Sequence, residues 1–221
     1  ILLPMFSLAS NMPPRLMRPL LAGLGAAVAA TAVGLAFGLR PAALVGGVLG
    51  LAAAALYVVA VERMLATRLR RKLGDEFVLI RVSEAALLLA VALGAALVAG
   101  APVPRGEALF GWLMIAGWLV SFLLAVLQRI LPFLISMHVR DARGRPPLAS
   151  TLAPRLPLVI HSACHLVALC GVGLGVMFDG VWLVRAGALV GAGGAVAFLW
   201  FAVAVAAHVR ASSTLAKGSE S

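Results

Sequence analysis

The longest apolar segment of the chain runs from residue 108 to residue 137 and reads ALFGWLMIAGWLVSFLLAVLQRILPFLISM. A helix needs ~20 residues to cross the hydrocarbon core of a bilayer, at a rise of ~1.5 Å per residue. This segment therefore predicts a membrane-spanning helix with turns to spare. Pro132 lies inside it and frees a carbonyl in the preceding turn, so we expect the helix to bend there.

Composition extends the same conclusion to the whole chain. Hydrophobic residues make up 63% of the sequence, charged residues only 12%, and the mean hydropathy is +1.09. Such values are typical of an integral membrane protein, for which the lipid bilayer is the expected partner. The net charge of +10 lies mostly in short loops between apolar stretches, where topology accounts for it, so we expect no nucleic acid as a partner.

Six apolar stretches divide the chain. We predict an all-α fold, a polytopic transmembrane helix bundle that forms a single domain over residues 20–209. Residues 1–19 are expected to be the end of a truncated helix plus a cytoplasmic turn, and residues 210–221 a disordered polar tail. The predicted spans are residues 20–39, 42–61, 77–98, 108–137, 156–178 and 181–209.

The distribution of basic residues predicts the orientation. If the N-terminus is cytoplasmic, thirteen Lys and Arg residues fall on the cytoplasmic side, against Arg40, Arg105 and Arg185 on the other. This bias follows the positive-inside rule, so we expect both termini in the cytoplasm. Arg81 and Arg129 lie within spans.

Charges within spans are costly and suggest either function or local neutralisation. Arg81 and Glu84 are three residues apart on one helix face, so they could neutralise each other. The alternative is an ion or proton path. Arg129 could pair with a heme propionate or extend toward the cytoplasmic headgroups.

The histidines form the most suggestive group of candidate ligands. His161 and His165 share a helix face at i and i+4, with Cys164 adjacent, and this set could hold a copper or zinc ion. The pair cannot supply both axial ligands of one heme, which approach from opposite faces. A heme would therefore need a ligand from another helix, such as His138. Ordinary polar packing between helices is the alternative to a cofactor.

Two pairs of glycines on the last two predicted spans indicate close helix packing. Gly171 and Gly175, like Gly187 and Gly191, are four residues apart, and small residues at this spacing let two membrane helices approach closely. Between these helices, the sequence Asp-Gly at residues 179–180 predicts a tight turn.

The fourth span carries a family resemblance. Gly117-Trp118, within GWLVSFLL, is followed by Pro132 within QRILPFL. This arrangement resembles the helix that carries the axial heme histidines in catalytic subunits of heme–copper oxidases and nitric oxide reductases, and it is similar to a group of bacterial membrane proteins like oxidase subunit I. The resemblance implies a bacterial cytoplasmic (inner) membrane, other membrane subunits as partners, and heme or copper as cofactor.

The chain also departs from that family. The resemblance would place an H-x-H pair at positions that hold Phe110 and Trp112, neither of which can ligate iron. The oxygen- or nitric-oxide-reducing centre is therefore expected to be absent. Oxidase subunits are built from repeated four-helix arcs, and residues 1–6, ILLPMF, resemble residues 130–133, ILPF, four predicted helices later. The resemblance thus implies an arrangement in four-helix arcs.

Three functions fit these observations. The first is an oxidase-like membrane subunit of a respiratory or electron-transfer complex, with heme or copper at the cytoplasmic-side histidines. The second is a cofactor-free accessory or assembly protein, and the third is a small transporter or channel. Whether the chain is an enzyme is left open, although we expect no catalysis from the chain by itself.

Overall fold

A computed structural model of the chain describes residues 14–66, 76–139, 147 and 149–218. Every regular element in this part is helical, and six helices are long and apolar enough to cross a membrane. The prediction of a six-span, all-α membrane protein is confirmed. The six spans are Arg15–Ala36, Arg40–Ala66, Phe77–Ala99, Gly106–His138, Arg155–Met177 and Val181–His208.

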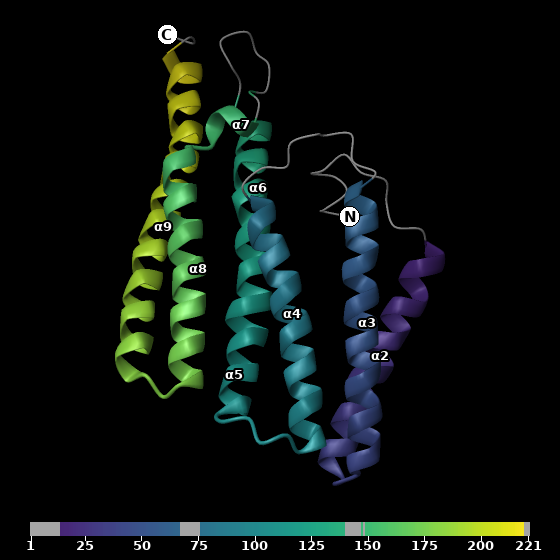
Figure 1. Cartoon of the computed structure of the whole chain (residues 1–221). Helices are drawn as coiled ribbons and strands as arrows, with labels where there is room; N and C mark the ends of the chain where they lie inside the picture. Colours follow the sequence, from purple (N-terminus) through teal and green to yellow (C-terminus); the bar gives the residue numbers. More distant parts are fainter. Residues whose placement is uncertain (1–13, 67–75, 140–146, 148, 219–221) are drawn as a thin grey trace. The chain divides into compact units, whose positions relative to one another are not determined.

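The chain divides into two compact units, Ile1–Phe122 and Leu123–Ser221, and the division falls within the fourth span. The single bundle over residues 20–209 and its four-helix arcs stay predictions. The first unit contains α2 (Pro14–Ala36), α3 (Arg40–Ala66), α4 (Glu76–Ala99), α5 (Gly106–Trp112) and the π-helix η1 (Leu113–Val120) (Figure 1). The second contains α6 (Ser121–His138) from Leu123 onward, α7 (Ala149–Leu152), α8 (Arg155–Met177) and α9 (Val181–Gly218).

Small residues let α2 and α3 pack closely in the first unit. A side chain at Gly34 would overlap Ala43, and one at Gly46 would overlap Thr31. The hydroxyl of Thr31 is already committed, because it donates a hydrogen bond to the Ala27 carbonyl at 2.8 Å. The two backbones therefore approach at positions where only glycine fits.

Arg40 at the start of α3 stabilises the end of α4. Its guanidinium donates hydrogen bonds to the carbonyls of Val98 at 3.3 Å and Ala99 at 2.5 Å. The last carbonyls of a helix have no partner within it and carry a partial negative charge, which a cation offsets. Gly100 follows with φ of 87°, a conformation that ends the helix and that glycine adopts without strain.

The fourth span contains a wide helical turn that we did not predict from the sequence. Residues Leu113–Val120, which include Gly117-Trp118, form a π-helix between α5 and α6. The hydroxyl of Ser121 donates to the Ala116 carbonyl, five residues earlier, at 3.1 Å. Segments of π-helix are rare and often occur at functional sites. The following helix α6 continues through Pro132.

The last two spans form an antiparallel hairpin within the second unit (Figure 1). The predicted turn is present, with Asp179 at φ of 58°. A side chain added at Gly171 would lie 3.5 Å from the Cα atom of Gly187, and one added at Gly175 would lie 2.9 Å from the backbone nitrogen of Val184. Close packing of α8 and α9 through these glycines is confirmed.

Two predicted boundaries differ from those observed. Helix α9 continues to Gly218, through residues expected to form a disordered tail, and the run of Ala, Ser, Leu and Lys there is compatible with helix. At the other end, α2 begins at Pro14 where a turn was expected, because proline is tolerated in a first helical turn. The expected end of a truncated helix, at residues 1–6, lies outside the described residues.

Candidate functional site

His161 is the most deeply buried of the candidate ligands. It lies in α8 with 3% of its surface exposed, and its Nδ1 lies 2.9 Å from the carbonyl oxygen of Gly194 in α9. A carbonyl can only accept a hydrogen bond, so Nδ1 must carry the proton and donate it. In a neutral imidazole the lone pair is then on Nε2. Nε2 is buried and has no hydrogen-bond partner among the described residues.

Packing of α8 on α9 determines the position of this ring. A side chain at Gly194 would lie 2.9 Å from the Cβ atom of Cys164, so the absence of one lets the α9 backbone come within reach of His161. The ring of His161 packs on Phe198, with centroids 4.9 Å apart, and Phe198 packs in turn on the fully buried Phe201 at 5.7 Å. The His161 ring is thus held by contacts with both helices.

His165 lies beside His161, as its spacing predicted. The two rings are stacked with centroids 6.1 Å apart, and His165 is half-buried. Cys164 faces the α9 backbone at Gly194. No group of three or more His, Cys, Asp and Glu side chains is arranged to hold a metal ion in the described part of the chain. The metal site at His161, Cys164 and His165 stays a prediction.

The remaining predicted site residues, His138 and Arg129, and the fourth histidine of the chain, His208, lie in different surroundings. His138 is exposed at the end of α6, and its Nδ1 lies 2.8 Å from the Leu134 carbonyl of the same helix. His208 in α9 is exposed as well and is 3.0 Å from the Ala204 carbonyl. Arg129 is half-buried in α6. Both exposed histidines thus bond to their own helices, whereas His161 bonds to another.

A polar contact links α6 to α8 one position from His161. The side-chain amide of Gln128 donates to the hydroxyl of Ser162 at 3.4 Å, and Gln128 is buried. Gln128 precedes Arg129 along α6. This contact connects the helix of two predicted heme-site residues, Arg129 and His138, with the helix of His161.

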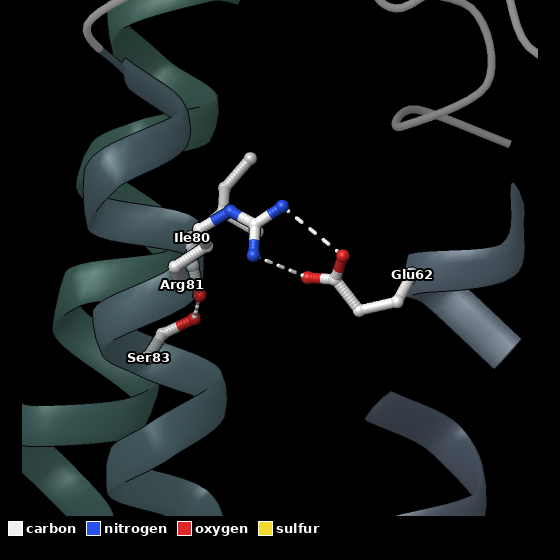
Figure 2. Close-up of polar contacts among 4 residues, drawn as sticks. All are labelled: Glu62, Ile80, Arg81 and Ser83. Atoms are coloured by element: carbon white, nitrogen blue, oxygen red, sulfur yellow. Dashed lines mark hydrogen bonds and ion pairs between the residues drawn. The ribbon is translucent and has the colours of Figure 1, made fainter. Parts of the chain in front are cut away.

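The first unit contains a separate charged cluster, shown in Figure 2. The guanidinium of Arg81 in α4 pairs with both carboxylate oxygens of Glu62 in α3, at 2.7 and 3.0 Å. Arg81 thus forms its ion pair with Glu62, and not with Glu84, the partner that the sequence suggested. The carboxylate of Glu62 accepts from two nitrogens of the guanidinium at once, which is a favourable geometry. The spacing of residues within one helix cannot predict a partner on another helix.

Glu84 consequently lacks the predicted ion pair. It is 5% exposed, and its Oε1 atom has no hydrogen-bond partner among the described residues. The hydroxyl of the preceding Ser83 is unavailable as a donor, because it bonds to the Ile80 carbonyl at 2.6 Å (Figure 2). Glu84 is thus a second buried group with an unsatisfied polar atom.

Two partners, Gly194 and Glu62, were not predicted from the sequence. Gly194 could have been found from the predicted turn, because contacting residues of a helical hairpin lie at similar distances from it along the chain. The contacts of Cys164 with Gly194 and of His161 with Phe198 both obey this relation for a turn at 179–180. No protein-family model, curated protein or solved structure matches the chain.

Proposed function

We propose that the chain is a membrane subunit of a bacterial respiratory or electron-transfer complex, built on an oxidase-like scaffold, and that it binds heme or copper through His161. The observation that carries this proposal is the buried Nε2 atom of His161, which has no hydrogen-bond partner in the described part of the chain. A buried polar atom of this kind calls for a ligand or another explanation.

The donor chemistry of His161 fits a heme iron or a copper ion. Metal-bound histidines commonly donate the proton of one ring nitrogen to a carbonyl or carboxylate, which leaves the other nitrogen free to bind metal. The bond from Nδ1 to Gly194 has this form. When bound, either group supplies one-electron transfer. Phe110 and Trp112 stand where the family resemblance expects ligands, so no oxygen- or nitric-oxide-reducing centre is proposed.

Other residues of the second unit would assist His161. His165 lies beside it on α8, and Cys164 between them faces α9. If the group were a heme, His138 of α6 would be our candidate for a second protein ligand. Arg129, also in α6, is proposed to neutralise a heme propionate.

A cofactor-free accessory or assembly role is the second candidate, and one observation favours it. Nε2 of His161 is covered by protein atoms, so a metal can approach it only if a neighbouring side chain moves. Phe198 packs against the His161 ring, with the two centroids 4.9 Å apart. In this role, His161 would serve only to join α8 to α9.

A reduced-minus-oxidised absorption spectrum of detergent-purified protein, with metal analysis of the same sample, tests the proposal. We expect heme bands or a copper signal in the wild type, loss of the signal in His161→Ala, and its retention in the matched control His208→Ala, since His208 is exposed. A colourless, metal-free and folded wild-type protein would refute cofactor binding and support the accessory role.

A further inference from the structure

We propose that Glu84 is a proton-binding site within the membrane, with a carboxyl group that holds an exchangeable proton in the resting protein. This site belongs to the first unit and is independent of the proposed cofactor. Glu84 lies in the span Phe77–Ala99, about 10 Å along the helix from Phe77. Ionisable side chains at such positions are rare and usually functional.

Arg81, the described cation that acts electrostatically on Glu84, is already neutralised. Arg81 uses both terminal nitrogens of its guanidinium to contact Glu62, so this pair has no net charge. An ionised Glu84 would add a negative charge without a counter-charge of its own. Burial of an unpaired carboxylate is costly, and buried carboxyl groups accept a proton instead.

Among the residues that the structure describes, three titratable side chains interact with Glu84 from the packed helices. Tyr57 and Glu62 of α3 and Arg81 of α4 interact with it electrostatically. The π-helix η1, which also packs on α4, has no titratable side chain. The only titratable side chain of helix α5 is Glu107. It follows the C-terminal end of α4, whereas Glu84 lies closer to the N-terminal end of that helix.

These neighbours favour a proton over a metal cation. A hard cation needs several oxygen ligands around it, and no group of three or more His, Cys, Asp and Glu side chains in the described residues could hold one. A single carboxyl oxygen suffices to hold a proton. The one buried oxygen, Oε1 of Glu84, is therefore enough to bind a proton.

The test is labelling with dicyclohexylcarbodiimide, an apolar reagent that reaches carboxyl groups within the membrane. A protonated carboxyl transfers its proton to a carbodiimide nitrogen, and its oxygen bonds to the central carbon to give an O-acylisourea. Transfer of the acyl group from oxygen to nitrogen then gives a stable N-acylurea that retains every atom of the reagent. Intact-mass and peptide mass spectrometry locate the adduct.

We expect the adduct on Glu84 of the wild-type protein, with a rate that falls as pH rises. Glu84→Gln should lose it, and Glu107→Gln, which removes a carboxyl outside this cluster, should retain it. Glu62→Gln should slow the labelling of Glu84, because Arg81 is then free to stabilise the carboxylate. Glu62→Gln combined with Arg81→Gln should restore the rate.

Three results would overturn the proposal. These are no adduct on Glu84 in the wild type, a labelling rate that does not depend on pH, or protection by sodium ions at constant pH. Sodium protection would show that the site binds a metal cation. Mapping of the wild-type adduct decides the question even if Glu84→Gln does not fold, and it involves none of the residues assigned to the cofactor.

Discussion

Among the described residues, each unit of the protein buries one side-chain polar atom without a hydrogen-bond partner, and the two atoms differ in chemistry. In the first unit it is a carboxyl oxygen of Glu84, beside the ion pair of Glu62 and Arg81. In the second it is the Nε2 atom of His161, whose other ring nitrogen bonds to the backbone at Gly194. We propose that the first binds a proton and the second a heme iron or a copper ion.

The comparison shows that neighbouring groups determine what such an atom can bind. Arg81 does not form an ion pair with Glu84, because both of its terminal nitrogens contact Glu62. The hydrogen bond from His161 to the backbone makes a ligand atom available instead. It keeps the proton on Nδ1, so that Nε2 has the lone pair. Glu84 thus lacks a counter-charge of its own, whereas His161 has a nitrogen atom that can bind a metal.

The largest predicted effect is a loss of stability when the packing of α8 on α9 in the second unit is disrupted. A side chain at Gly187 would lie 3.0 Å from the backbone nitrogen of Val172, and backbone cannot move aside cheaply. Gly187→Leu should therefore destabilise the protein by ~3 kcal/mol, measured by thermal unfolding in detergent. Gly193→Leu is the matched control, because nothing lies within 4 Å of a Cβ atom added at Gly193. Equal losses in the two variants would contradict the packing described for α8 and α9.

A smaller effect should separate the two buried atoms. His161→Ala removes a hydrogen bond and a packed ring, and should lower the free energy of unfolding by ~2 kcal/mol even without a cofactor. Glu84→Gln should change it by less than ~1 kcal/mol, because a protonated carboxyl and an amide are similar in size and both neutral. Chemical denaturation of the two variants in one detergent measures the difference. A greater loss in Glu84→Gln would mean that Glu84 is ionised.

The smallest effect concerns the ion pair beside Glu84. Arg81 and Glu62 lie one turn from the ends of their spans, where water and headgroups screen charges, so we expect a coupling energy of only ~0.5 kcal/mol. A double-mutant cycle of Arg81→Gln and Glu62→Gln, followed by thermal unfolding, measures this coupling. If it exceeds ~2 kcal/mol, lipid shields the pair strongly and Arg81 contributes more to the first unit than we infer.

The sequence by itself determined the six spans, because a bilayer imposes a minimum length of apolar helix. It also determined the hairpin of α8 and α9, since the Asp-Gly turn and the spaced glycines are local signals that packing does not override. The proximity of His161 and His165 followed from helix geometry alone.

Only the tertiary structure decided which groups are partners. Arg81 contacts Glu62 on another helix instead of Glu84 on its own, and His161 contacts the backbone of Gly194. The π-helix at Gly117-Trp118 likewise escaped the sequence analysis. Contacts between helices depend on how the two helices are rotated and shifted relative to each other. The spacing of residues within one helix does not determine this arrangement.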